Sequence, residues 1–475
     1  MSFWALRLQP PGPAGPSTTT MTPLWCLALG AATLGVSAAL ILSTIHDDDN
    51  TTYSAKTGKK KKKIATKKQT SIPSPLTTHL PHLTLSERSA LPYPPDLLPG
   101  ARSVPTPYGT IHVFEFGPLD GPKVLLLPGI STPCISLAAL AESLVARGCR
   151  VMLFDLFGRG YSDAPLPGEV DYDLRLYATQ VLLVLASSPV AWTGDDAFHL
   201  VGYSLGGGLA VGFARYFASM VRSVVVIAGG GLVRREHVGW RSRVLYGKGW
   251  LPDGVVHWLV RRRLMPPEGN GSGGRTETKM AAEAVGNGNG AEKGRWHKNS
   301  DVRGGDDFDN AVLLARRPEY TVSSVMDWQL RHHEGFIPAF VSSIRHAPIY
   351  EQTEDWLALG QHLNERRTRP ELPGLRGGKI LMILGASDPV VLKEEFIHDA
   401  TAVLGEDGFE AVVFDTGHEL VMTRADDIAR AVSAFWKRTQ GEARLPPADP
   451  PRQPCQAAKN PIGRPNQRNF SPLQG

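Results

Sequence analysis

Cysteine is scarce in this chain, which has only four cysteines among 475 residues. They are scattered along the sequence, at Cys26, Cys134, Cys149 and Cys455, and no pair has the spacing of a metal-ligand motif. A chain of this length with so few cysteines has no disulfide framework of the kind that small secreted domains use. The sequence therefore argues against a metal centre and indicates free thiols, which favours a cytosolic setting for the folded part.

A strong excess of charge of one sign is also absent, since the formal net charge is +5. Most of the excess comes from eight lysines in one short stretch, namely Lys56, Lys59, Lys60, Lys61, Lys62, Lys63, Lys67 and Lys68. A nucleic-acid-binding domain would spread its basic residues over a folded face, with aromatic residues between them. We therefore expect no nucleic-acid partner and interpret the lysines as a solvated flank beside a membrane.

Residues 24–45 contain no charged side chain and read LWCLALGAATLGVSAALILSTI. As a helix this segment would be about 33 Å long, enough to cross a hydrocarbon core of about 30 Å. Pro23 can start the helix, and His46 with the aspartates after it can end it. The sequence predicts a single transmembrane helix at 24–45. A cleaved signal peptide is the alternative, although the run is long for one and no basic region adjoins it.

The orientation of this helix follows from the basic residues on its two sides. Only Arg7 precedes it, whereas the eight lysines follow it, so the positive-inside bias places the rest of the chain in the cytoplasm. We expect a single-pass protein of an endomembrane such as the endoplasmic reticulum. Glycosylation sequons at Asn50, Asn270 and Asn469 keep the opposite orientation open.

Both ends of the chain are rich in proline and polar residues and offer little apolar surface to bury. Such segments do not offset the entropy that ordering costs. We therefore expect disorder at 1–23, in a lysine- and proline-rich linker at 46–100, and in a tail at 441–475. The part between, about 101–440, is long enough for one large core.

Short apolar runs alternate with helical patterns from residue 102 onwards, and continuous runs such as KVLLL at 123–127 are typical of strands buried on both faces. The expected strands lie at 103–106, 110–116, 123–127, 150–154, 199–202, 223–228, 379–384 and 411–414, and the expected helices at 135–147, 172–186, 205–216 and 428–438. The pattern predicts an α/β fold with a mostly parallel sheet covered on both faces, and an antiparallel hairpin at one edge.

One long segment interrupts this alternation before the last two strands. Residues 233–264 and 311–359 have helical patterns, and between them 266–306 is rich in glycine, asparagine and lysine. We expect a helical cap at 231–360, with a disordered insert at about 266–306. The cap would divide the core into a first part at 101–230 and a second part at 361–440.

The segment Gly202-Tyr203-Ser204-Leu205-Gly206 has the pattern G-x-S-x-G, which carries little weight alone in a chain with 49 glycines. Its setting is more informative, because a strand pattern runs into it and a helix with small residues runs out of it. This strand–turn–helix arrangement is what a nucleophile elbow requires. Ser204 would lie at a helix N-terminus, where free amides favour developing negative charge, and is the candidate nucleophile.

A serine nucleophile needs a basic histidine that an acid orients, in the chain order Ser, Asp, His. Asp388 follows the strand at 379–384 and His418 follows the strand at 411–414, so both lie at the same sheet edge as Ser204. Either residue alone could be an ordinary loop residue, but all three in this order indicate a catalytic triad. The oxyanion hole would use the amide of Leu205 and, as the best candidate in the loop after 123–127, that of Ile130. No metal or cofactor is expected.

These motifs resemble the α/β-hydrolase superfamily, in the branch with a cap inserted in the second half of the sheet. The resemblance covers about 101–438 and rests on Leu127-Pro128-Gly129, the stretch DLFGRGYSD at 155–163, the Ser204 motif and the loops of Asp388 and His418. In that family the DLFGRGYSD stretch is a structural loop, which implies that Asp155 and Ser162 are not catalytic.

Two positions bear on the type of hydrolase. Pro128 stands where many members have histidine, which puts that half of the oxyanion hole in doubt. Ser204 stands where epoxide hydrolases and haloalkane dehalogenases have aspartate, which argues against both activities.

The resemblance implies a serine hydrolase that cleaves carboxylic esters through an acyl-enzyme. With the anchor expected at 24–45, such an enzyme would meet monoacylglycerols or other lipid esters. The same triad serves carbon–carbon bond hydrolases, to which residues 335–340 (GFIPAF) are also similar, and cofactor-free peroxidases, thioesterases and aminopeptidases. A non-catalytic ligand-binding protein and a membrane scaffold are further alternatives. The substrate, its acyl length and the oligomeric state stay open.

Overall fold

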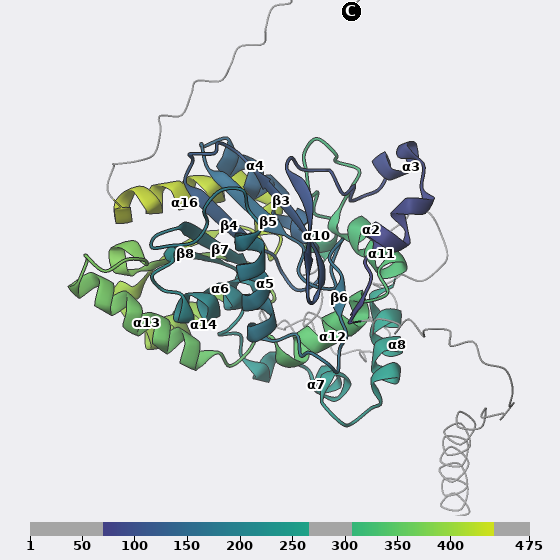
Figure 1. Ribbon diagram of the computed structural model, residues 1–475. Coiled ribbons are helices and arrows are strands. Elements are labelled where there is room, and N and C mark those ends of the chain that lie inside the picture. The colour runs from purple at the N-terminus through teal and green to yellow at the C-terminus, as the bar shows by residue number, and fades with distance from the viewer. Residues whose placement is uncertain (1–69, 266–305, 441–475) are drawn as a thin grey trace, which may run out of the picture. The chain divides into compact units, whose positions relative to one another are not determined.

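The computed structural model describes residues 70–265 and 306–440 (Figure 1). The chain divides into two units, 1–67 and 68–475, and every described residue belongs to the second. The transmembrane helix expected at 24–45, the lysine run, nearly all of the insert expected at 266–306 and the tail at 441–475 lie outside the described residues. Within the described ranges, no helix has the length and apolar character needed to span a bilayer.

Eight strands form one sheet in the order β10-β9-β8-β7-β4-β5-β3-β2. Their bounds are β2 (Ala101–Thr106), β3 (Gly109–Phe116), β4 (Lys123–Leu127), β5 (Arg150–Phe154), β7 (Phe198–Tyr203), β8 (Val221–Ile227), β9 (Ile380–Gly385) and β10 (Phe409–Phe414). The neighbours along β10-β9-β8-β7-β4-β5 pair in parallel. At the other end of the sheet, β3 pairs antiparallel with both β5 and β2. The predicted parallel sheet with an antiparallel hairpin at one edge is confirmed.

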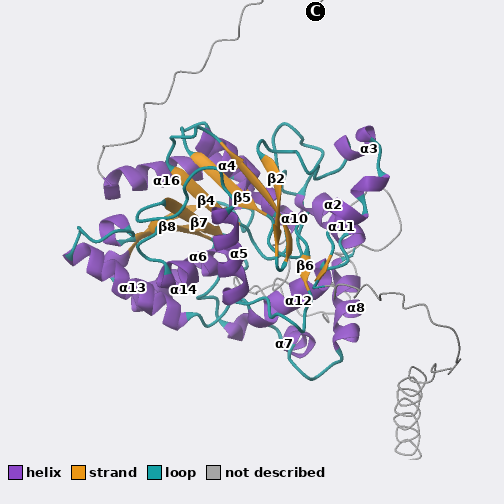
Figure 2. Ribbon diagram, viewed as in Figure 1, coloured by secondary structure: helices purple, strands orange, loops and turns teal. Residues whose placement is uncertain are grey.

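Helices cover both faces of this sheet (Figures 1 and 2). On one face, α4 (Ala138–Val145) packs against α16 (Ala425–Gln440). On the other face lie α5 (Leu174–Ala186), α6 (Leu205–Tyr216), α13 (Thr353–Thr368) and α14 (Lys393–Leu404). Because helices shield both faces, central strands carry runs of buried aliphatic residues, four of the five residues in β4 and five of the seven in β8.

The segment at 70–100 is ordered, so the expectation of a disordered linker up to residue 100 is wrong for this part. It contains β1 (Ser71–Ile72), α2 (Pro75–Thr78), a 3₁₀ turn (Leu80–His82) and α3 (Leu85–Ser89), whose start is fixed by a capping box between Thr84 and Glu87. β1 pairs with β6 (Ala164–Pro165). The physical reason lies in three apolar residues, Leu80, Tyr93 and Leu98, which bury their side chains completely or almost so in the core.

Of the helices described between β8 and β9, four are here called the insert helices: α7 (Trp240–Tyr246), α8 (Asp253–Leu264), α11 (Val322–His332) and α12 (Phe336–His346). A short turn, α10 (Asp306–Asp309), precedes α11. The insert helices share a hydrophobic cluster of their own, formed by Tyr246, Val256, Val260, Leu330, Phe336, Ile337, Phe340 and Val341. In Figure 1, α7, α8 and α12 lie together at the lower right.

The boundary expected at residue 360 falls inside a helix. α13 continues from Thr353 to Thr368 and packs along α6 and α14. Its buried residues Trp356, Leu359 and Leu363 belong to the main core. α13 is therefore part of the helical layer on the sheet, and the core resumes before residue 361.

Candidate active site

Ser204 occupies the sharp turn between β7 and α6, with φ 53° and ψ −121°, a conformation that residues with a side chain rarely adopt. Two glycines make the turn possible. A Cβ on Gly202 would lie 2.0 Å from the carbonyl oxygen of Gly206, and one on Gly206 would lie 2.2 Å from that of Leu127. The two glycines of the G-x-S-x-G pattern therefore make this tight turn sterically possible. The turn points the Ser204 side chain away from the sheet.

The structure brings Ser204, His418 and Asp388 together, although more than 180 residues separate the serine from the other two. The Oγ atom of Ser204 lies 3.1 Å from Nε2 of His418, and Nδ1 of His418 lies 2.8 Å from Oδ2 of Asp388. Asp388 and His418 are 4% and 5% exposed, so these bonds form largely out of contact with water.

Asp388 has its carboxylate fixed from two directions. It follows β9, and its Oδ1 atom accepts hydrogen bonds from the amides of Val390 at 2.7 Å and Val391 at 3.0 Å. These amides leave Oδ2 for His418. An anchored carboxylate of this kind selects the tautomer of the imidazole that carries its proton on Nδ1 and leaves Nε2 as an acceptor.

Tyr203 and Glu419 hold the loop of His418, and neither is a candidate site residue on sequence grounds. The Tyr203 hydroxyl donates to the carbonyl oxygen of His418 at 2.7 Å. Burial, reinforced by the charges of Asp388 and Glu419, raises the pKa of Tyr203 well above its usual value, so the phenol keeps this proton. Glu419 accepts from the Thr416 hydroxyl at 2.6 Å and the Gly417 amide at 2.9 Å. The only signal for these two residues in the sequence is that a glutamate directly follows the candidate histidine.

The amides expected to form an oxyanion hole belong to two segments that meet at Ser204. Leu205 is the first residue of α6, and Ile130 lies in the loop after β4. In that loop a Cβ on Gly129 would lie 3.4 Å from Cβ of Ser204, so the loop runs directly beside the serine. Among the described residues, neither the Leu205 amide nor the Ile130 amide donates a hydrogen bond.

Two buried polar side chains, Arg159 and Gln329, tie this loop to the insert helices. Nε of Arg159 donates to the Ile130 carbonyl at 3.0 Å, and its Nη2 donates to Ser343 of α12 at 2.9 Å. Gln329 of α11 donates to the Ser131 carbonyl at 3.0 Å and accepts from the Gly160 amide at 2.8 Å. The sequence offered one signal for Gln329, a polar residue on the same helix face as Val322 and Val325.

Asp155 and Ser162 belong to a hydrogen-bond network that includes no bond to Ser204 among the described residues. Asp155 is fully buried and accepts from the amides of Cys134 and Tyr161 at 2.9 Å and from the Tyr93 hydroxyl at 3.0 Å. Burial raises the pKa of Asp155. Ser162 donates to the Asp155 carbonyl at 2.7 Å. The bonds within this loop are those of a structural element.

The ring of Phe308, in α10, lies 5.9 Å from the ring of His418. Nearby, a groove of about 930 Å³ runs between α4, residues 307–315 and the segment that follows His418. Its walls combine apolar residues such as Leu313 and Met422 with the carboxylates of Asp307 and Glu419. The described surface next to the histidine is therefore partly apolar and partly acidic.

Residues 122–259 match the family described as alpha/beta hydrolase fold. The chain is 28% identical over 146 residues to an uncharacterized protein of Mycobacterium tuberculosis, a match that covers 31% of this chain and 40% of the relative. It is 31% identical over 157 residues to the pimeloyl-(acyl-carrier protein) methyl ester esterase of Aeromonas hydrophila, covering 33% of this chain and 56% of that enzyme. The chain thus spans less than two thirds of either relative.

Among solved structures, the enol-lactonase of Burkholderia xenovorans is similar, with a TM-score of 0.45 and 15% identity over 71% of this chain and 100% of that one. The strand order of the sheet and the family match at residues 122–259 support the fold assignment without this weak structural similarity. The protein has the α/β-hydrolase fold.

Proposed function

We propose that the protein is a serine hydrolase that cleaves carboxylic esters, with Ser204 as nucleophile, His418 as general base and Asp388 as the acid that orients it. The observation that carries this proposal is the continuous pair of hydrogen bonds from Ser204 Oγ through His418 to Asp388, at 3.1 Å and 2.8 Å. The strained backbone of Ser204 supports it too, because such strain concentrates at functional positions.

In the proposed reaction, Nε2 of His418 takes the hydroxyl proton as Oγ of Ser204 attacks the ester carbon. Asp388 stabilises the imidazolium through its bond to Nδ1 without taking the proton itself. The tetrahedral intermediate collapses to an acyl-enzyme, and His418 returns the proton to the departing alkoxide. Water then attacks the acyl carbon by the same route and releases the acid.

The amides of Leu205 and Ile130 would stabilise the negative charge on the carbonyl oxygen in both steps. Pro128 has no side-chain donor and leaves this task to the backbone. In this proposal Arg159 and Gln329 are positioning residues, since they hold the carbonyls of Ile130 and Ser131, the two residues that follow Gly129, and never contact the substrate.

A carboxylic ester is the substrate class with the most support. The relative from Aeromonas is a methyl ester esterase by name and is 31% identical to this chain over 157 residues. The partly apolar groove beside the His418 loop suits an aliphatic part of such an ester. The insert helices would act as a cap that limits the entry of water to the acyl-enzyme.

We also propose that the enzyme works on lipid esters at an endomembrane, anchored by a helix at 24–45 with the catalytic domain in the cytoplasm. The support is the uncharged run of the sequence and the surface of the insert. Residues 233–264 contain eight arginines and lysines against two acidic residues, and Trp240, Trp250 and Trp258 are 71%, 73% and 57% exposed. Tryptophan and basic residues together favour the interface of an anionic membrane.

The test uses the detergent-solubilised full chain with p-nitrophenyl esters of increasing acyl length and a fluorophosphonate probe. Wild type should hydrolyse the esters and label at Ser204, and Ser204→Ala should do neither, whereas Ser89→Ala, which removes an exposed hydroxyl, should behave as wild type. A labelled wild type that spares every ester but cleaves a dienone would replace esterase with carbon–carbon bond hydrolase. Failure to label at Ser204 would point to a ligand-binding protein.

The membrane proposal needs its own test, a cell fractionation with and without residues 24–45. Full-length protein should stay with membranes in alkaline carbonate, and the shortened chain should not. Protease added to intact vesicles should then digest the catalytic domain if it faces the cytoplasm. Release of the full-length protein by carbonate would contradict an integral anchor.

A further inference from the structure

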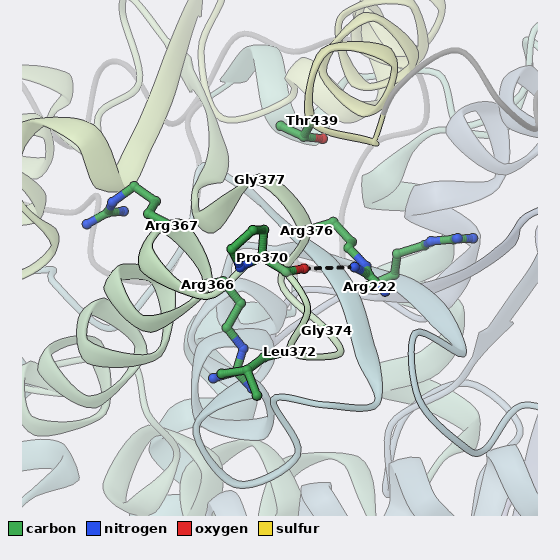
Figure 3. A pocket seen from close by; sticks show the side chains of 9 residues that line it. All are labelled: Arg222, Arg366, Arg367, Pro370, Leu372, Gly374, Arg376, Gly377 and Thr439. Carbon is green, nitrogen blue, oxygen red and sulfur yellow. Dashed lines mark hydrogen bonds between the residues drawn. The ribbon is translucent and has the colours of Figure 1, made fainter.

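A cavity of about 490 Å³ lies at the amino end of β8, where the last turn of α13, residues 370–377 and the end of α16 meet (Figure 3). Its lining includes four arginines: Arg222, Arg366, Arg367 and Arg376. The remaining lining residues are Pro370, Leu372, Gly374, Gly377 and Thr439, none of which carries a charge. This cavity has the size of sites that hold small organic ligands.

Two of the four guanidinium groups have a carboxylate partner. Arg376 pairs with Asp196, and its Nη1 donates to the Pro370 carbonyl at 3.2 Å, a bond drawn in Figure 3. Arg366 pairs with Glu365 at 2.8 Å. These bonds hold two arginines and the surrounding loop in place, and they leave the charge of the other two uncompensated.

Arg222 and Arg367 form no ion pair with any carboxylate in the described ranges of the chain. Arg367 donates only to uncharged acceptors, among them the Asp407 carbonyl at 3.3 Å and the side-chain carbonyl of Asn364 at 3.4 Å. Arg222 donates no hydrogen bond to any described residue, and its Nε atom is buried without a partner. The Arg222 side chain is only half-buried, but its Nε–H is shielded from solvent without an acceptor, and an anion bound in the cavity would supply one.

The two unpaired arginines lie apart. In Figure 3 Arg367 and Arg222 are on opposite sides of Pro370 and Arg376. A single small anion would reach one of them, whereas an elongated anion with charge along its length would reach both. Guanidinium groups bind phosphate oxygens in bidentate fashion, and a chain of phosphates supplies such oxygens at regular intervals.

We propose that this cavity binds an oligophosphate, the chemistry shared by inorganic polyphosphate and the phosphate tail of a nucleotide. Arg222 and Arg367 bind its two ends, and Arg376 and Arg366 line the space between. Ser204 follows the carboxyl end of β7, whereas Arg222 is the second residue of the neighbouring β8, about 17 Å away along the strand. The proposal is thus independent of the proposed esterase reaction and concerns a different edge of the sheet.

The test is calorimetric titration of the full chain with phosphate, pyrophosphate and tripolyphosphate at low ionic strength. Affinity should rise with the length of the phosphate chain and fall as salt is added. Arg222→Gln with Arg367→Gln should weaken tripolyphosphate binding by about 100-fold, about ten-fold for each charged contact. The control, Arg424→Gln with Arg430→Gln, removes the same charge from α16 and its preceding residue and should bind as wild type. Equal binding by both double variants would overturn the proposal.

A second measurement does not depend on the variants folding. Phenylglyoxal labels arginines of the wild-type chain, and tripolyphosphate should slow labelling of Arg222 and Arg367 but not of the exposed Arg430. The same labelling is repeated with ATP in place of tripolyphosphate. Stronger protection by ATP than by tripolyphosphate identifies a nucleotide, and equal protection identifies the phosphate chain alone. Absence of protection at both arginines with either compound rejects the site. In Ser204→Ala, tripolyphosphate should protect Arg222 and Arg367 from labelling as it does in wild type, whether or not the enzyme is an esterase.

Discussion

At the carboxyl ends of β7, β9 and β10, the side chains of Ser204, His418 and Asp388 are hydrogen-bonded to one another, whereas at the amino end of β8 a surplus of positive charge is left. Asp388 accepts three hydrogen bonds, and both ring nitrogens of His418 are within bonding distance of a partner. At the opposite edge, Arg222 and Arg367 have no carboxylate within the described ranges.

The difference indicates what each edge is suited to do. A reaction needs groups whose geometry is set before the substrate arrives, which the internal bonds of the Ser204 site supply. A binding site for a charged ligand needs groups whose partners are supplied by the ligand, which the arginine cavity offers. Variants that affect only one of the two proposed functions, ester hydrolysis or oligophosphate binding, test this difference between the edges.

Ser204→Ala should have the largest effect. Without the nucleophile, hydrolysis of p-nitrophenyl esters should fall by a factor on the order of 10⁴ to 10⁶, because only the binding groups and the oxyanion donors remain. Binding of tripolyphosphate, measured by calorimetry on the same preparation, should not change. Loss of both would mean that the two edges of the sheet are coupled.

Asp388→Asn should lower kcat by about 10³- to 10⁴-fold, because the amide favours the wrong tautomer of His418. The variant should keep its fold, since Oδ1 of the asparagine can still accept from Val390 and Val391. Asp415→Asn, an exposed change shortly before His418, is the matched control and should keep full activity. A near-normal rate for Asp388→Asn would remove Asp388 from the proposed mechanism.

Much of the sheet could be predicted because its strands are continuous aliphatic runs. KVLLL and RVMLF fall on β4 and β5 without a shift, and the turn Pro107-Tyr108-Gly109 lies at the predicted hairpin. The order of Ser204, Asp388 and His418 was also predictable, because residues after parallel strands meet at one edge. Their roles stay a prediction until activity is measured.

Other features could not be predicted because they depend on contacts between distant segments. Tyr93 lies in a proline-rich stretch, and its burial in the core and its bond to the distant Asp155 help to explain why 70–100 is ordered. The continuation of α13 past residue 360 depends on its packing against α6. The arginine cavity joins positions 222, 366, 367 and 376, which no local pattern connects.

His199 lies near the arginine cavity and makes the stability of this edge of the sheet depend on pH. This buried histidine is near the start of β7 and stacks on Trp436, and burial, with the nearby charge of Arg222, lowers its pKa to about 3. Above pH 6.5 the ring is neutral in both states, but below it the unfolded chain binds a proton that the folded protein refuses. Stability should therefore fall as pH drops from 6.5 to 4, by on the order of 3 kcal/mol from this residue.

Urea unfolding of wild type and His199→Asn across this range measures the effect. The variant should lose less stability in acid than wild type, and Arg222→Gln should shift the response in the same direction by a smaller amount. His398→Asn, at an exposed position of α14, should lose as much stability in acid as wild type. Parallel pH curves for wild type and His199→Asn would contradict the prediction.

Gln329→Leu should have the smallest effect, confined to the serine side. The change removes the donor to the Ser131 carbonyl and the acceptor for the Gly160 amide, so the loop with Ile130 is held less firmly. Since the oxyanion donors act mainly in the transition state, kcat should fall by about 10-fold with little change in KM. Gln361→Leu, at an exposed position of α13, is the control. A rise in KM at constant kcat would instead assign Gln329 to substrate binding, and an unchanged rate would show that Arg159 alone suffices to hold the loop.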